Sequence, residues 1–451
     1  MLVPLLYRYF LVSLLLSFTH QAAGQDSIWT LERCIAYAKQ NNLSIQEAVL
    51  NERVSRMSVE ESKLSQLPSI SLSTNYGRNF GRSIDPTSNT FITRAYDYAG
   101  LGGSASVLVF GWFQKRNTIA KNALLNQASK IEQKQIERDI MLNITTGYLR
   151  ILLAKEQVLI AVKRMELGIA QVKRTERLIV TGLSNGQDLA QVRTQLVIDS
   201  VNYFKTQLAL AQAKIDVKAI LNLELEIPFD VAPVADDILP VLISPEAVWS
   251  DAISVSAKTQ HAKLKLKAAQ KDKLIAKATL LPQLTVGASA GTNYSSFFSE
   301  QTPAGETRTM PLGRQLNTNF SQSLSLGVSI PIFSGHAARY RVKRAEAAIE
   351  QNTLQYKEQE VQLKQSVYKA CNDACTAYQT HVGARSAAHL AETAMYFAQK
   401  RFEKGLISAI ELLTAQNMLF QAGIDEATSR YDLIFKRATI EYYRNGLWFK
   451  N

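Results

Sequence analysis

The chain contains Leu64-Ser-Gln-Leu-Pro-Ser-Ile-Ser-Leu-Ser-Thr-Asn-Tyr76 and, further on, the similar stretch Thr279-Leu-Leu-Pro-Gln-Leu-Thr-Val-Gly-Ala-Ser-Ala-Gly-Thr-Asn-Tyr294. In each stretch a helical sequence ends at a proline and an alternating strand follows. The register continues beyond the strands, because Gly182-Leu183 corresponds to Gly405-Leu406 at nearly the same offset. A repeated unit must bury a face that one copy cannot bury alone. The sequence therefore predicts two similar halves, each ordered as helix, strand pair, long helix and return helix.

We expect four segments along the chain: a signal peptide at residues 1–24, a first repeat over 25–223, a linker over 224–245 and a second repeat over 246–451. Arg8 and the apolar run that follows it, with small residues before Gln25, are typical of a secretory signal. The first cysteine, Cys34, lies beyond this site in a predicted helix, so no lipid-attachment cysteine is expected. No later apolar run is long enough to span a membrane as a helix. The mature protein is expected to work outside the cytoplasm.

Four strands are predicted from period-two alternation, over residues 69–76, 101–110, 283–294 and 320–330. A soluble sandwich would also alternate, but the strand lengths and the aromatic residues near the strand ends favour the wall of a membrane barrel. The opposite sides of the strands are small and uncharged. We predict that the membrane-facing residues include Ile70, Leu72, Tyr76, Leu284, Val286, Leu324, Leu326 and Val328.

Four strands cannot close a barrel, and an open sheet edge is not tolerated in lipid. Strands must therefore be shared between chains. Two chains would give eight strands, which side chains fill, whereas three would give twelve. The polar segments 77–97 and 295–319 are then predicted to be extracellular loops.

The predicted helices have two lengths. From Lys115 to about Leu178, and from Ala337 to about Lys404, there is no proline and almost no glycine, so each helix would be about 100 Å long. The helices predicted over 31–67, 184–223, 246–281 and 408–443 are about half as long, and two must stack end to end to match a long one. The fold class is thus an α+β membrane protein, with long helical hairpins and four strands per chain in a shared trimeric 12-stranded barrel. A soluble coiled-coil scaffold is the alternative for the helices, but it leaves the strands without a role.

Other classes of protein are disfavoured. Three cysteines cannot form a disulfide scaffold, and Cys371 and Cys375, four residues apart and followed by His381 and His389, are expected to be small core residues rather than a metal site. The net charge of +12 is spread along helices among Glu and Gln, so no nucleic-acid partner is expected. The five histidines are dispersed and no glycine-rich phosphate loop occurs, so neither an enzyme nor a cofactor is expected.

The chain resembles TolC-like outer-membrane efflux proteins over nearly its whole mature length. The resemblance rests on the order of several short motifs: Trp29-Thr-Leu-Glu-Arg-Cys-Ile-Ala-Tyr-Ala-Lys-Gln-Asn-Asn42, Val-Phe-Gly111, Arg401-Phe-Glu-Lys-Gly-Leu406 and Glu411-Leu-Leu-Thr-Ala-Gln416. It implies a homotrimer with a barrel in outer-membrane lipid and a helical tunnel in the periplasm. It also implies partners, namely a periplasmic adaptor (membrane fusion) protein and an inner-membrane pump. The linker would contribute to the belt around the tunnel.

The function implied is the exit duct of a tripartite efflux system. The duct of a type I protein secretion system has the same architecture and is an alternative. A secreted coiled-coil scaffold or adhesin is an alternative of another class.

The resemblance also implies a closed periplasmic tip made by the two hairpin turns, at Gly182-Leu183 and Gly405-Leu406, where the adaptor would bind. Members of the family carry aromatic, basic and acidic residues in the gate at this tip. Phe402 and Glu411 match the aromatic residue and one acid, whereas Ile407 replaces the basic residue and Thr414 the other acid. Closure by packing of Phe402, Leu406 and Ile407 is therefore expected.

Two acidic residues follow the predicted turns. Asp188 comes three residues after Asn185, and Glu411 three after Ser408. Such acids cap a helix and its dipole. Under threefold symmetry they would also form a carboxylate ring that favours cations. Both roles stay open at this point.

Overall fold

The computed structural model describes residues 28–84, 89–93, 95–234, 244–301, 303 and 307–445. The predicted signal peptide and residues 235–243 of the predicted linker lie outside them. The chain divides into two compact units. The first consists of residues 1–47, 134–256 and 362–451, and the second of residues 48–133 and 257–361.

The same order of principal elements occurs in both halves of the chain. The first half contains α2 (Leu31–Asn41), α3 (Leu43–Leu64), β2 (Ser69–Asn79), β5 (Tyr96–Phe110), α4 (Gln114–Val180) and α5 (Gly186–Leu221). The second half contains α6 (Pro245–Val255), α7 (Ala257–Ala278), β7 (Gln283–Ser295), β10 (Ser321–Ser329), α9 (Ala337–Glu403) and α10 (Ala409–Asn445). Helices α4 and α9 have 67 residues each, so each is about 100 Å long, as predicted.

Two helices predicted to be continuous are broken. The predictions over 31–67 and 246–281 were wrong at Asn42 and Ser256, which have extended backbones between α2 and α3 and between α6 and α7. The Asn42 side chain accepts hydrogen bonds from the N–H groups of Ser44 (3.0 Å) and Ile45 (3.2 Å) and donates one to the Ile220 carbonyl (2.7 Å). Asn42 therefore caps α3 and attaches it to α5. An asparagine competes with backbone bonding in this way, yet a single one is a weak sequence signal.

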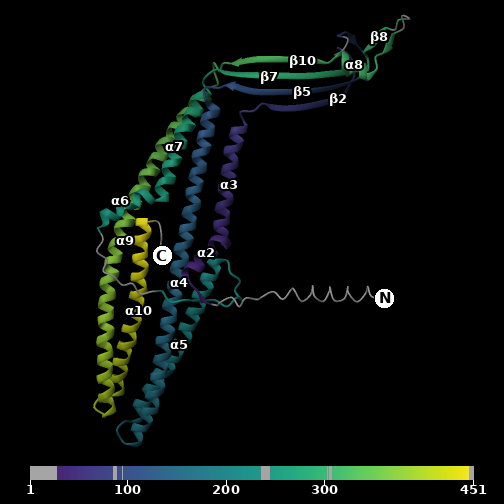
Figure 1. Cartoon of the computed structure of the whole chain (residues 1–451). Coiled ribbons are helices and arrows are strands. Elements are labelled where there is room, and N and C mark those ends of the chain that lie inside the picture. Colours follow the sequence, from purple (N-terminus) through teal and green to yellow (C-terminus); the bar gives the residue numbers. More distant parts are fainter. Residues whose placement is uncertain are drawn as a thin grey trace, which may run out of the picture. The chain divides into compact units, whose positions relative to one another are not determined.

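The second unit contains an antiparallel sheet in the order β10-β7-β5-β2 (Figure 1). All four predicted strands are present, although β5 starts at Tyr96, five residues before the predicted start. The segments predicted to be loops contain short elements, which the sequence analysis missed: β3 (Ser83–Ile84), β4 (Phe91–Ile92), β8 (Ser299–Gln301), β9 (Thr307–Thr309) and α8 (Leu312–Thr318).

The cysteine prediction was correct for one residue and wrong for the other. Cys371 of α9 is buried in a cluster with Val248 of α6 and Ile440 of α10, whereas Cys375 is exposed. His381 is buried, with its Nδ1 3.2 Å from the Ser429 hydroxyl. No group of three or more potential metal-ligating side chains occurs among the residues that the structure describes.

The main core of the first unit is built around β1 (Ile28–Trp29) and β6 (Asp230–Val231), which pair in parallel. Tyr148 of α4 is almost fully buried beside them. Its hydroxyl lies 2.7 Å from the Ala232 carbonyl and 3.0 Å from that of Trp29, and donates toward both. The apolar side chains of this core include Ile144, Ile151, Val217, Leu221 and Phe229.

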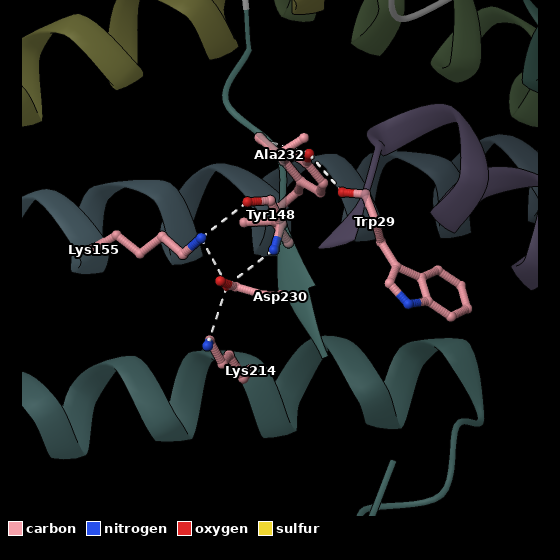
Figure 2. A network of polar contacts seen from close by, with 7 residues as sticks. Trp29, Tyr148, Lys155, Lys214, Asp230 and Ala232 are labelled. Carbon is pink, nitrogen blue, oxygen red and sulfur yellow. Dashed lines mark hydrogen bonds and ion pairs between the residues drawn. The ribbon is translucent and has the colours of Figure 1, made fainter. Parts of the chain in front are cut away.

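A charged network fixes the same strand pair to two helices (Figure 2). The Asp230 carboxylate lies 2.7 Å from the Lys155 ammonium and 3.2 Å from that of Lys214. Lys155 also donates to the Val231 carbonyl (2.9 Å). Partial burial raises the pKa of the Asp230 carboxyl, but hydrogen bonds from Lys155, Lys214 and the Val231 N–H outweigh it, and the net pKa is lowered.

We expect this network to stabilise the first unit only above acidic pH. Because the pKa of Asp230 is lower in the folded state, its contribution is fully present above the unfolded value of about 3.9 and is lost as the pH falls through the folded value. The Tm of Asp230→Asn should therefore lie below that of the wild type at neutral pH and converge with it below about pH 4. Asp216→Asn, which removes an exposed carboxylate from α5, is the control. A Tm difference for Asp230→Asn that persists unchanged at low pH would contradict the ion-pair role.

Candidate functional site

The two hairpin turns of the first unit share the same backbone geometry. Gly182 and Gly405 have φ of 75° and 70°, in the left-handed region that favours glycine. In the first turn Gly182 N–H donates to the Ile179 carbonyl and Leu183 N–H to the Leu178 carbonyl. The second turn has the same two bonds, from Gly405 and Leu406. This double hydrogen bond is the Schellman motif that ends a helix, so the predicted glycine turns are confirmed.

Side-chain caps start the return helices. The Asn185 side chain accepts a hydrogen bond from the Asp188 N–H (2.9 Å) and caps α5, while the Asp188 carboxylate accepts one from the Ser184 hydroxyl (3.0 Å). In the second hairpin the Ser408 hydroxyl accepts from the Glu411 N–H (3.3 Å), and the Glu411 carboxylate lies 3.5 Å from the Ser408 N–H. These reciprocal contacts of Ser408 and Glu411 form a capping box at the start of α10. Asp188 instead holds the side chain of the preceding turn residue and adds negative charge to the first turn of α5.

A small apolar core lies just above the turns. It is formed by side chains of all four hairpin helices, and its buried members are Val192, Met395, Phe402, Ala409 and Leu412. Phe402 is only 5% exposed, so its ring packs inside its own chain. The sequence analysis expects Phe402 to pack in the closed gate, and within one chain its ring lies in the core that holds the hairpins together.

Three apolar residues of the turns are more accessible. Leu183 and Leu406 are 58% and 65% exposed, and Ile407 is half-buried against the same core. The two turns are neighbours, because a Cβ on Gly405 would lie 3.7 Å from Leu183 Cδ2. The sequence prediction that the turns gather at one end of the hairpins is consistent with this contact.

Polar contacts also join the hairpin helices, both within the first hairpin and between the two hairpins, and sequence reasoning missed them. Arg174 of α4 pairs with Glu403 of α9 (3.1 Å). Arg164 pairs with the buried carboxylate of Asp199 (2.7 Å) and donates to the Asn417 side chain (2.6 Å). These partners are 35 to 253 residues apart in sequence, so no local spacing could have identified them.

The sheet of the second unit has two chemically different faces. Strand register places Ser71, Ser104, Ser289 and Ser323 in one continuous row across β2, β5, β7 and β10. The hydroxyls of Ser71 and Ser104 are 2.8 Å apart, as are those of Ser289 and Ser323. The two flanking rows on this face contain only serine and glycine, so the side chains there are small, uncharged and mostly polar.

The opposite face is apolar and exposed. Ile70, Leu72 and Tyr76 of β2 are 73–80% exposed, and Leu324, Leu326 and Val328 of β10 are 62–80% exposed. Leu284 and Val286 lie on the inner strand β7 and are half-buried. Contiguous exposed apolar surface of this kind is a binding or membrane surface, and its period-two pattern is that of a barrel wall.

The described helices do not themselves supply a membrane span. None of those within residues 28–84, 95–234, 244–301 and 307–445 is both long and apolar enough to cross a bilayer.

Long helical hairpins, together with a sheet that has one apolar and one polar face, define an outer-membrane channel class. The profile of the outer membrane efflux protein family matches residues 34–223 and 248–443. The chain therefore belongs to this family of outer-membrane efflux channels. It is located in the outer membrane, with its helices in the periplasm.

Particular relatives agree with this assignment. The chain is 23% identical to the pyoverdine export outer membrane protein OpmQ of Pseudomonas putida over 81% of this chain and 73% of that protein. It is 25% identical to the probable outer membrane lipoprotein SilC of Salmonella typhimurium over 88% and 83% of the two chains. The CmeC outer membrane channel of Campylobacter jejuni has the same fold, with a TM-score of 0.79, 16% identity and coverage of 93% and 87%.

We expect Asn185→Ala to loosen the first hairpin without unfolding the chain. Loss of a side-chain cap costs about 1 kcal/mol, so amide exchange at Asp188 should accelerate about fivefold when it proceeds through local opening. Hydrogen exchange read by mass spectrometry would measure this. Gln187→Ala, an exposed neighbour, is the control. Unchanged protection at Asp188 would show that the cap does not limit opening.

Proposed function

We propose that the protein is the exit duct of a tripartite efflux system, which passes substrates from an inner-membrane pump and a periplasmic adaptor to the exterior. The observation that carries this proposal is the two-faced sheet in a chain with 67-residue helices. An apolar outer face suits lipid, and a serine and glycine inner face suits a water-filled path. The chemistry required is passage rather than catalysis.

The functional unit we propose is a homotrimer. β2 and β10 are the two edges of the four-stranded sheet, and unpaired edges are not stable in hydrocarbon. Three copies would supply twelve strands and close the barrel. Channels of this family are trimeric and work with adaptor and pump partners, which supports this arrangement. We also propose that the two halves of the chain are an internal repeat, so that three chains give sixfold pseudosymmetry.

The hairpin turns are the proposed adaptor-contact site. Leu183 and Leu406 are exposed apolar residues beside the glycines of the two turns, which suits docking by a partner. In the gate that we propose, Leu406 and Ile407 make the closing contacts and buried Phe402 supports them from inside. Asp188 and Glu411 add a ring of carboxylates.

The linker has a separate proposed role in the belt around the tunnel. Its described part, up to Val234, joins the core through β6 and the Tyr148 contacts.

Two alternatives have weaker support. A protein secretion duct would share the architecture, but OpmQ is named for export of pyoverdine, which favours efflux of small solutes. A secreted scaffold or adhesin accounts for the helices but not for the exposed apolar strand face.

The first test is the mass and conductance of the full mature protein. Light scattering in detergent, with the detergent contribution subtracted, should give three chains, and planar bilayers should show a low closed-state conductance. Ile407→Ser with Leu406→Ser should raise that conductance, because the closing contacts are removed, whereas Leu208→Ser, an exposed change on α5, should not. A soluble monomer, or an absence of conductance in every variant, would overturn the proposal that the protein is a duct.

A second test concerns the carboxylate ring. Asp188→Asn with Glu411→Gln keeps polar caps but removes charge, so cation preference in the reversal potential under asymmetric salt should fall. Glu392→Gln, an exposed change on α9, is the matched control and should leave it unaltered. If the double variant also keeps the full preference, only the local role of the two acids at the helix starts remains.

A further inference from the structure

Positive charge is concentrated in the second unit of the protein. This unit contains 24 Lys and Arg residues against 13 Asp and Glu, whereas the first unit contains 27 against 26. It therefore carries +11 of the formal net charge of +12. The strands and the parts of the helices next to them are thus far more basic than the remainder of the chain.

Part of this charge lies where helix electrostatics disfavours it. Neither α4 nor α9 has an acidic residue in its first turn. Arg116 and Arg339 are the third residues of α4 and α9, and Arg341, Lys343 and Arg344 follow in the second turn of α9. The first turn of a helix carries partial positive charge and stabilises anions rather than cations. Arg116 and Arg339 depart from this preference at both strand-to-helix junctions.

These basic side chains are exposed and lack carboxylate partners within the described part of the chain. No described carboxylate lies within ion-pair distance of the five residues, which we call the basic collar: Arg116, Arg339, Arg341, Lys343 and Arg344. The first acidic residue of α9, Glu346, is already bound by Lys273 at 3.1 Å. The collar therefore offers unneutralised guanidinium and ammonium groups to an external anion.

The basic collar follows the strands at one end of the sheet, where β5 and β10 stop and β7 begins. Phe110, the last residue of β5, pairs with Leu284, and Ser329, the last of β10, pairs with Gln283. Both strands thus stop at the end of the sheet where β7 begins, and α4 starts four residues after Phe110. The basic groups consequently lie next to the boundary of the apolar strand face.

Exposed aromatic residues lie at the same boundary. Trp112 and Phe113 have positive φ values of 50° and 61°, which is uncommon for bulky residues. Trp112 Nε1 donates to the Pro282 carbonyl (2.9 Å), and Phe113 is 60% exposed. At the other junction Phe333 is 78% exposed. Aromatic side chains concentrate at the level of lipid headgroups in membrane barrels.

We propose that the basic collar binds the phosphate groups of anionic phospholipids in the periplasmic leaflet of the outer membrane. Clusters of about four to eight Lys and Arg residues next to a membrane surface attract anionic lipid, and guanidinium matches phosphate oxygens in a bidentate geometry. Bound phosphate would offset the unfavourable charge at the two helix starts. The aromatic residues would set the depth of the sheet, and the collar would hold the helices at the leaflet surface.

The test uses quenching of Trp112 fluorescence by brominated lipid. The full mature protein is reconstituted in nanodiscs of phosphatidylcholine and phosphatidylglycerol, with one of the two lipids brominated in each sample. We expect the wild type to prefer phosphatidylglycerol about fivefold near the collar. Trp112→Phe identifies the signal, because it should remove the lipid-dependent quenching.

Two charge-matched variants decide the outcome. Arg116→Gln/Arg339→Gln/Arg341→Gln/Arg344→Gln should abolish the preference. Lys258→Gln/Lys263→Gln/Lys265→Gln/Lys267→Gln removes equal charge from α7, roughly 16–30 Å from its strand-proximal end, and should keep it. Equal quenching by the two lipids in the wild type, or the same loss in both variants, would overturn the proposal.

Two further measurements test the proposal: the salt dependence of the lipid preference, and the reversal potential of the collar variant. If the collar variant does not assemble, the wild type is titrated from about 0.1 M to about 1 M salt, where screening shortens the Debye length from about 10 Å to about 3 Å. The lipid preference should then fall steeply, and a salt-independent preference would overturn the proposal. A collar variant that shifts the reversal potential toward cations, with lipid preference intact, would place the charges along the solute path instead.

Discussion

The pairing of backbone groups at the edges of the four-stranded sheet is the constraint on which this protein depends. In hydrocarbon an unpaired N–H or carbonyl costs several kcal/mol, and the described sheet has β2 and β10 as open edges. Ile70 and Leu324 on those strands are 80% exposed, so the edges belong to the most apolar part of the surface. These open edges support the proposal that further copies of the chain close the barrel.

In the helical part of the protein, the short helices together match the length of a long helix. In each half an 11-residue helix is followed by one of 22 residues, and a helix of 36 or 37 residues returns from the hairpin turn. One short pair and one return helix together have slightly more residues than the 67 of α4 or α9. The breaks at Asn42 and Ser256 each separate an 11-residue helix from a 22-residue helix. The 11-residue helices belong to the first unit, and most residues of the 22-residue helices belong to the second. The short helices thus break near the boundaries of the units along the chain, whereas α4 and α9 each contribute residues to both units.

The sequence predicted what local periodicity encodes and missed what distant residues create. The strand of Ser69–Asn79 was predictable because Ile70 and Leu72 alternate with serine, and the glycine turns because only glycine suits their positive φ. The breaks at Asn42 and Ser256 were not predictable, since Asn42 is held by a carbonyl 178 residues away. The burial of Phe402 was not predictable for a related reason, because it depends on Val192 from the other hairpin. The short strands β8 and β9 lack any strong alternation.

The two ends of the first unit differ in how completely their polar groups are satisfied. Around β1 and β6 the buried Tyr148 hydroxyl has carbonyl partners and Asp230 has two ammonium partners, while Trp29 Nε1 is buried without a protein partner among the described residues. Nearer the turns, Thr175 Oγ1 and both amide atoms of Gln416 are buried without a protein partner among the described residues. Each such group costs about 1–3 kcal/mol unless water reaches it, so local opening requires less free energy near the turns. Lower stability near the turns would suit the opening that we propose for that end of the duct.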